Sequence, residues 1–167
     1  MKKNVFVSAL ALLLAAACLL SSCAKTAPKY FTMTAAKDAY APGEEIEVNV
    51  TLNNVENVAL FDLKISFDAD VLTLTDAVQG SVSDFILMTN PKENYVLING
   101  FCATTCDFTS ETVATLYFTV NEGASGKIKL LSTATSFQIG TDDRGDETQE
   151  LTDKKNITSS LTLNVAG

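Results

Sequence analysis

The clearest alternation of apolar and polar residues in the chain lies in the stretch Val58–Leu74. Every second residue of its first part is apolar, a period of two that predicts a strand with one buried face. These residues are Phe61, Leu63, Ile65 and Phe67, and the polar residues between them are Asp62, Lys64 and Ser66. Followed toward the N-terminus, the polar side holds Val58 and Leu60. Apolar residues on both sides indicate a strand that lies beneath a second layer or faces a partner.

Segments of similar pattern recur along the chain and predict further short strands. They are Tyr30–Ala35, Glu45–Leu52, Val71–Val78, Phe85–Thr89, Tyr95–Phe101, Glu111–Val120, Lys127–Leu131, Phe137–Gly140 and Ser159–Val165. We expect Asn53–Asn57 to be a loop, and the segment 90–94, which contains Pro and Asn, to close a hairpin. About nine or ten short strands, with no convincing helix and no internal repeat, predict one all-β domain built as a β-sandwich.

The N-terminal stretch has the composition of an export signal. Lys2 and Lys3 give it a positive start, and Val5–Leu20 is an apolar run that is short for a membrane span. The run ends in Leu20-Ser21-Ser22-Cys23, an aliphatic residue and two small residues before a cysteine, which resembles the bacterial lipobox.

The lipobox resemblance implies a division of the chain into three parts. Residues 1–22 would be a lipoprotein signal peptide that is removed, and Cys23 would be acylated. Residues 23–30 would then tether the domain 31–167 to a bacterial membrane or the cell surface. An ordinary signal peptide followed by a chance cysteine is the alternative.

Composition argues against several functions. The chain has no His, which excludes Ser-His-Asp and Cys-His catalytic groups and the commonest zinc ligand sets. It has 12 Lys and Arg against 20 Asp and Glu, and the resulting net charge of −8 repels nucleic acid and anionic lipid. No acidic residue stands in a recognisable catalytic context, and the missing Trp removes the usual platform for stacking sugars. We therefore expect a protein that is neither an enzyme nor a nucleic-acid binder, with no cofactor and no structural metal.

The order and spacing of several segments resemble the cohesin domain of bacterial cellulosomes. An early strand and the segment Asn53-Asn54-Val55 precede Phe67-Asp68-Ala69-Asp70-Val71-Leu72, an aromatic-Asp-x-x-Val-Leu pattern. Val113–Val120 is similar to the seventh strand of that family, and Leu161–Val165 is similar to its last strand. The resemblance covers roughly residues 31–166. It implies a nine-stranded jelly-roll β-sandwich that is not an enzyme and that binds a dockerin, a small calcium-loaded helical module on another protein.

The resemblance also implies where the partner binds. Cohesins meet dockerin on the sheet made by their strands 8, 3, 6 and 5, and the Val58–Phe67 strand corresponds to strand 3. Asp62 aligns with an acid that contacts dockerin, whereas Leu60 falls where a polar Asn is common. The apolar runs Phe85–Met88 and Tyr95–Ile98 must also point some side chains out of the core, and an exposed apolar patch usually marks an interaction site. The predicted partner-binding residues are Val58, Leu60, Asp62, Lys64, Tyr95 and Leu97.

Alternatives remain open for this face and for its partner. An insertion such as Cys102–Ser110 could cover the face, or its apolar residues could be the ordinary scatter of a protein surface. The partner could be a carbohydrate, bound by coplanar exposed aromatic rings, or an envelope protein other than a dockerin. We expect a monomer that acts as a surface-anchored adaptor.

Four cysteines are present, of which two belong to the expected domain. Cys18 leaves with the signal peptide and Cys23 is the expected lipid attachment point, so Cys102 and Cys106 remain. In an exported protein, these two are expected to form a disulfide across Ala103–Thr105. The closed loop is short, so the bond would mainly shape the turn. Two free thiols are the alternative.

One acidic segment, Thr141–Glu150, gathers carboxylates around a glycine. Its acids are Asp142, Asp143, Asp146, Glu147 and Glu150. Clustered carboxylates can bind Ca²⁺, but Arg144 and Gly145 interrupt the spacing that an EF-hand loop requires. We expect a solvated surface loop.

Overall fold

The computed structural model describes residues 29–141 and 147–166. The expected signal peptide, Cys23 and most of the expected tether lie outside the described residues, as do Asp142, Asp143 and Asp146 of the acidic segment. Within the described part of the chain, no helix is long and apolar enough to cross a membrane.

The described residues form nine strands and one short helical turn, which confirms the predicted all-β architecture. The strands are β1 (Phe31–Ala35), β2 (Ala39–Tyr40), β3 (Glu45–Phe67), β4 (Leu72–Gln79), β5 (Ile86–Pro91), β6 (Tyr95–Val120), β7 (Lys127–Gly140), β8 (Thr148–Glu150) and β9 (Thr158–Val165). The helical turn, α2, spans Lys154–Ile157. Strands β3, β6 and β7 are longer than expected, because each joins two segments that the sequence pattern separates.

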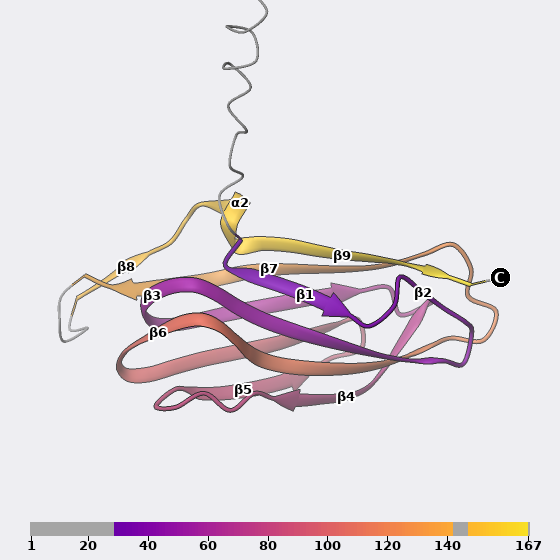
Figure 1. The fold of residues 1–167 in the computed structure, drawn as a ribbon, viewed down its shortest axis with the longest axis horizontal. Helices are drawn as coiled ribbons and strands as arrows, with labels where there is room; N and C mark the ends of the chain where they lie inside the picture. The colour runs from indigo at the N-terminus through magenta and orange to yellow at the C-terminus, as the bar shows by residue number, and fades with distance from the viewer. Residues whose placement is uncertain (1–28, 142–146, 167) are drawn as a thin grey trace, which may run out of the picture.

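Strands β3 and β6 form a long antiparallel ribbon that is folded back on itself. Their pairing runs from Glu45 opposite Thr119 to Ser66 opposite Tyr95, with an irregular register near the middle. Figure 1 shows both strands bending at the same end of the domain, so that each strand contributes to two layers. The ribbon is therefore the frame on which the other strands assemble.

The bend takes the place of the predicted loop at Asn53–Asn57. Residues 102–110, considered above as an insertion that could cover the face, belong to β6 at the same bend. Asn54 and Asn57 have φ angles of 46° and 57°, left-handed values that asparagine adopts more readily than most residues. They redirect β3 while residues on both sides of them stay paired with β6. The alternation breaks in this region because the backbone turns, and not because pairing ends.

The remaining strands complete two packed layers. One layer has the strand order β1, first half of β3 (residues 45–52), second half of β6, and β4 at the edge. The other layer has the strand order β7, second half of β3 (residues 58–67), first half of β6, and β5 at the edge. Strand β9 pairs with β7 and β2, and β8 pairs with the end of β7. The Thr89 hydroxyl in β5 donates to the Ala77 carbonyl oxygen in β4 (3.0 Å), which joins the two edges.

The core between the layers contains the residues that the alternation predicted. The four apolar residues of that pattern are all buried: Phe61, Leu63, Ile65 and Phe67. The Phe61 ring packs against the rings of Phe31 and Phe85, with centroid distances of 5.2 and 5.6 Å. Gly100 lies opposite Phe61 in β6, and a Cβ atom there would come within 2.6 Å of the Phe61 ring and 2.3 Å of the Phe85 ring. The missing side chain at Gly100 is what lets both rings pack against this strand.

Val58 is fully buried, which corrects its predicted outward orientation. Register shifts in the β3–β6 pairing lie on both sides of Val58. An irregularity of this kind switches the side on which a strand presents its residues. The neighbouring Ala59 is only 8% exposed, so two consecutive residues point away from solvent here. Alternation counted back from Phe61 across the irregularity therefore assigns Val58 to the wrong side.

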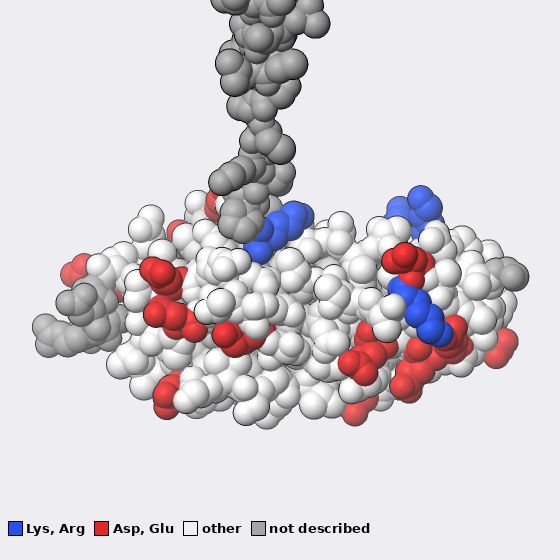
Figure 2. Space-filling model, viewed as in Figure 1, with Lys and Arg blue, Asp and Glu red and all other residues white. Residues whose placement is uncertain are grey.

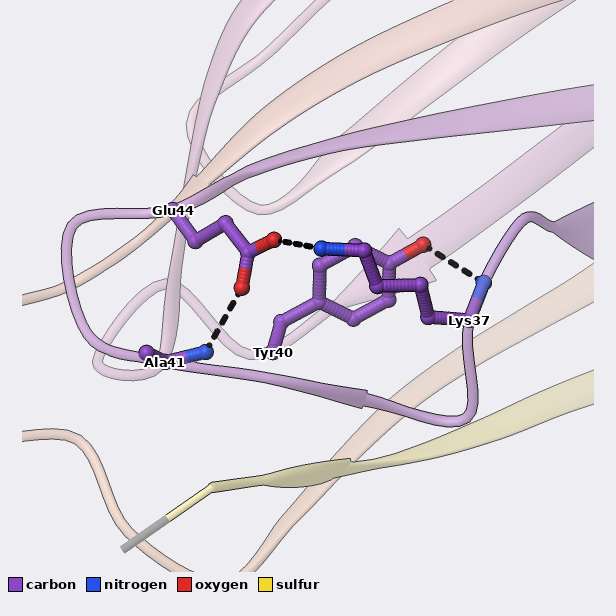
Figure 3. A network of polar contacts seen from close by, with 4 residues as sticks. All are labelled: Lys37, Tyr40, Ala41 and Glu44. Atoms are coloured by element: carbon purple, nitrogen blue, oxygen red, sulfur yellow. Dashed lines mark hydrogen bonds and ion pairs between the residues drawn. The ribbon is translucent and has the colours of Figure 1, made fainter.

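A polar network holds the link between β1 and β3 (Figure 3). Lys37 Nζ donates to Glu44 Oε1, and Glu44 Oε2 accepts the Ala41 backbone N–H at 3.0 Å. The Lys37 backbone N–H donates to the hydroxyl oxygen of Tyr40 at 3.1 Å, and the Tyr40 side chain is buried. The hydrogen bond between the two side chains lowers the pKa of Glu44 and raises the pKa of Lys37. The turn that leads into β3 is therefore held by a buried ring and by an exposed ion pair.

We expect Gly100→Ala to lower the free energy of unfolding by about 1–3 kcal/mol or more, because the new methyl group overlaps two packed rings. Urea denaturation followed by circular dichroism measures the change. Ser66→Ala, on the outward side of β3, is the matched control and should shift the free energy by less than about 0.5 kcal/mol. A Gly100→Ala protein as stable as the parent would show that the two rings move freely.

Val58→Asp and Leu60→Asp test the two sides of β3. An aspartate at position 58 would place an unpaired charge in the core, so we expect a loss of about 3–5 kcal/mol or a failure to fold. The same residue at position 60 lies on the outward side and should cost about 1 kcal/mol or less. Denaturation of both variants measures the difference, and equal losses would contradict the assignment of sides.

Candidate functional site

The candidate site is the outer surface of the layer made by β7, β3, β6 and β5, here called the four-strand face. The pairing register arranges its residues in rows across the strands. The first row is Gln138, Leu60, Phe101 and Ile86. The second row is Ser136, Asp62, Asn99 and Met88, and the third is Thr133, Lys64, Leu97 and Asn90. The last row is Leu131, Ser66 and Tyr95.

The predicted partner-binding residues, with one exception, lie on this face. Those on the face are Leu60, Asp62, Lys64, Tyr95 and Leu97, all of them half-buried. Val58 points into the core and is withdrawn from the site. Residues 102–110 do not cover Phe101 and Ile86, which stay exposed. Three of these residues, Cys106, Phe108 and Ser110, pair with β3 at the bend. That these residues bind a partner stays a prediction.

The polar side chains at the centre of the face are held by neighbouring strands. The Asn99 side-chain amide donates to Asp62 Oδ1, and the Thr135 hydroxyl donates to the Asp62 backbone carbonyl at 3.2 Å. Lys64 Nζ lies 4.3 Å from the centroid of the Tyr95 ring, a cation–π contact that orients both side chains. A carboxylate offers about four acceptor positions, so Asp62 keeps capacity for a hydrogen bond from a partner.

Large exposed apolar side chains gather on the four-strand face. Among the described residues, five are exposed: Ile86 (55%), Met88 (47%), Leu131 (47%), Val78 (46%) and Phe101 (41%). All except Val78, which lies in β4 of the other layer, belong to the face. Phe101 lies between Leu60 and Ile86 in the pairing register, so these three form a continuous apolar row. This clustering, unlike scattered exposure, is typical of an interaction site.

Several residues of the face are absent from the set of predicted partner-binding residues. Asn99 and Phe101 continue the alternation of Tyr95 and Leu97 along the same side of β6, so the signal was present in the sequence. Ile86 and Met88 come from an apolar run that was expected to contribute outward side chains. Which members of that run face outward is decided by the register of β5 against β6, which is a long-range property.

The outer surface of the other layer is more polar. One row across it contains Thr34, Asn49, Thr115 and Val78, and the Thr115 hydroxyl donates to the Asn49 side-chain oxygen at 3.0 Å. Figure 2 shows one side of the molecule, on which acidic side chains outnumber basic ones and gather toward its two ends. The rows of the four-strand face, in contrast, carry one acid and one base, Asp62 and Lys64. Binding there would depend on apolar contact more than on net charge.

Cys102 and Cys106 are free thiols in the structure, and the disulfide between them stays a prediction. Both side chains are half-buried and pack against the hydrophobic core. Burial raises the pKa of the Cys106 thiol to about 12, and the adjacent Cys102 thiol and the carboxylates of Asp84 and Asp107 act in the same direction. Cys102 directly follows Phe101, so the pair borders the four-strand face.

An open depression of about 620 Å³ lies at the bend of the β3–β6 ribbon. Its lining includes the carboxylates of Glu56 and Asp107, and Asp107 accepts the Asn57 backbone N–H at 2.8 Å. Across residues 29–141 and 147–166, no three or more His, Cys, Asp or Glu side chains are grouped so as to hold a metal ion. Asp107 therefore serves to hold the bend, beside a residue with a left-handed backbone.

Comparisons with known proteins agree with the fold. A family model described as the cohesin domain matches residues 31–158. Cellulose-binding protein A of Clostridium cellulovorans is 38% identical to this chain over 77 residues, which are 46% of the chain and 4% of that protein. The chain thus corresponds to a small part of a much longer relative.

Solved structures of cohesins share the architecture. The seventh ScaB type I cohesin from Pseudobacteroides cellulosolvens has a TM-score of 0.58 and 19% identity, over 83% of this chain and 93% of that chain. A type I cohesin–dockerin complex from Clostridium thermocellum has a TM-score of 0.58 and 18% identity, over 83% of this chain and 100% of that chain. A non-cellulosomal cohesin from the archaeon Archaeoglobus fulgidus has a TM-score of 0.55 and 17% identity, over 82% of this chain and 91% of that chain. Because the family model spans most of the described residues and the fold agrees with these structures, the chain belongs to the cohesin domain family.

Proposed function

We propose that this chain is a non-catalytic adaptor whose four-strand face binds a dockerin carried by another exported protein. The observation that carries the proposal is the gathering of exposed large apolar side chains on that face, with Leu60, Phe101 and Ile86 in one row. Among the described residues, Val78 is the one large apolar side chain outside this face that is comparably exposed. A surface of this kind is stabilised when a partner covers it.

The arrangement of the face fits a helical partner. Interfaces combine an apolar centre with polar groups that fix orientation, and a few well-packed residues supply most of the binding energy. Here the apolar row lies directly beside the Asp62–Asn99 pair. A helix lying across the strands can place an apolar side chain against Leu60 and Phe101 and donate a hydrogen bond to Asp62. The comparisons support this choice of partner, since one of the similar solved structures is, by its name, a type I cohesin–dockerin complex.

The carbohydrate-binding alternative requires flat, exposed and coplanar aromatic rings. The rows of the four-strand face contain two aromatic residues, Tyr95 and Phe101, and these stand in the last and first rows. The Lys64 ammonium already lies over the Tyr95 ring. The two rings do not form a stacking platform for a sugar chain, so a protein partner accounts better for the apolar surface.

The proposed adaptor role includes export and membrane attachment through the N-terminal leader. Acylation of Cys23 after removal of residues 1–22 would leave the domain as a monomer on a short tether at the bacterial membrane or cell surface. The lipobox-like order Leu20-Ser21-Ser22-Cys23 supports this part of the proposal. Dockerin-bearing proteins, such as enzymes that degrade polysaccharides, would then be held at the cell.

The binding experiment uses residues 24–167 immobilised as bait for the secreted proteins of the source organism. A dockerin module from a captured protein is then purified, and its dissociation constant is measured against variants. We expect Leu60→Asp and Phe101→Asp each to weaken binding by about 2 kcal/mol, or roughly 30-fold, because a charge replaces an apolar anchor. Val78→Asp, a change of similar exposure on the other layer, is the matched control and should leave the constant unchanged.

Calcium chelation adds a second readout to this experiment. Chelator should abolish binding, because the dockerin partner is calcium-loaded, yet leave the melting temperature of this domain unchanged. Capture of no dockerin-bearing protein, or equal binding by the parent and the Leu60 and Phe101 variants, would contradict the proposed function.

Cys23→Ala tests the anchor separately. We expect the parent, expressed in a bacterial host fed with labelled fatty acid, to incorporate the label and to fractionate with membranes. The variant lacks the thiol that receives the lipid, so it should take up no label and remain unprocessed or be released. Equal labelling of the two proteins would rule out Cys23 as the attachment point.

A further inference from the structure

Strand β6 makes an excursion at the end of the four-strand face. In the pairing register, Leu60 lies opposite Phe101 and Val58 lies opposite Cys106. One residue of β3, Ala59, therefore faces the four residues 102–105 of β6. The excursion begins at Cys102 and ends where pairing resumes at Cys106, so the two cysteines mark its base.

The two thiols lie together at this base. Cys102 Sγ lies within hydrogen-bonding distance of two carbonyl oxygens, those of Val58 (3.3 Å) and Thr104 (3.0 Å). Cys106 Sγ lies 3.8 Å from the carbonyl oxygen of Asp84. The Cys102 and Cys106 side chains also interact directly with each other. Three segments meet at this pair: the irregular part of β3, the excursion itself, and the turn before β5.

We propose that Cys102 and Cys106 are oxidised in the exported protein to an intramolecular disulfide that closes the base of the β6 excursion. The two S–H bonds are replaced by one S–S bond, and two protons and two electrons pass to the disulfide form of a thiol–disulfide oxidoreductase. Exported compartments maintain such oxidants, whereas the cytosol keeps thiols reduced. The chain would therefore carry thiols before export and the disulfide after it.

The raised pKa of Cys106 fits a pair that needs an oxidoreductase. The thiolate is the form that attacks a disulfide, and Cys106 supplies little thiolate near neutral pH. Spontaneous oxidation by a small disulfide should be slow by comparison.

The disulfide would fix one end of the binding surface. Phe101 precedes Cys102 directly and is the middle residue of the row Leu60–Phe101–Ile86. A closed base limits the movement of the backbone that carries this ring, so less conformational entropy is lost when a partner packs against it. This consequence for binding rests on the proposed function, whereas the formation of the bond requires only that the chain is exported and not that it binds a dockerin.

The thiol state is tested on the chain exported to the periplasm of a bacterial host. The purified protein is denatured without reductant, treated with iodoacetamide and measured by mass spectrometry of the segment that holds both cysteines. We expect no alkylation there, and two alkyl groups after reduction. Two alkylated thiols in the unreduced protein, persisting after incubation with oxidised glutathione and a bacterial oxidoreductase, would overturn the proposal, and so would a disulfide between two chains.

Hydrogen exchange tests the structural role. We expect reduction to speed amide exchange in residues 101–107 several-fold in the parent, because the excursion opens more often. The double variant Cys102→Ser and Cys106→Ser should exchange like the reduced parent and show no further change with reductant. Unchanged exchange on reduction of the parent would contradict the role assigned to the bond. The dockerin measurements fail or succeed independently of these two, so loss of one proposal leaves the other standing.

Discussion

The packing of Phe61 against a strand with no side chain at Gly100 is the constraint on which the rest of the domain depends. Phe61 also contacts the rings of Phe31 in β1 and of Phe85, the residue before the edge strand β5, so it joins parts of both layers in one cluster. Because neighbouring residues of a strand point to opposite sides, burying Phe61 sends Leu60 and Asp62 outward. The burial of Phe61 therefore determines both the packing of the core and the residues presented on the candidate binding surface, so a change in the core also changes that surface.

The fold class and most strand positions could be predicted because alternation is a local property of the sequence. The bend at Asn54 and Asn57 could not, because a break in alternation looks the same whether a strand ends or turns while still paired. Pairing of β3 with β6 through the bend is decided by residues far apart in the chain. The count of nine strands is confirmed, although the boundaries of β3, β6 and β7 differ from those expected.

The candidate site shows the same limit. Leu60, Asp62 and Lys64 were placed on the correct side because an unbroken alternation links them to Phe61. Val58 was placed wrongly because the β6 excursion shifts the register between it and Leu60, and nothing near Val58 in the sequence reports that shift. Phe101 acquires its importance only through its position opposite Leu60 and Ile86. The side of the strand on which a residue lies could be inferred from the local pattern. Which residues lie next to it on the face depends on how the strands pair.

The folded-back ribbon of β3 and β6 also bears on how the chain reaches its native state. Neither layer can form from one contiguous part of the sequence, because each contains half of β3 and half of β6. Residues near Glu45 must find residues near Thr119 before the first layer exists, and closing so long a stretch of chain is entropically costly. Domains dominated by such distant contacts fold slowly, in milliseconds to seconds. The two layers are therefore gained and lost together, as one cooperative unit, and a partly built sandwich has no stable form.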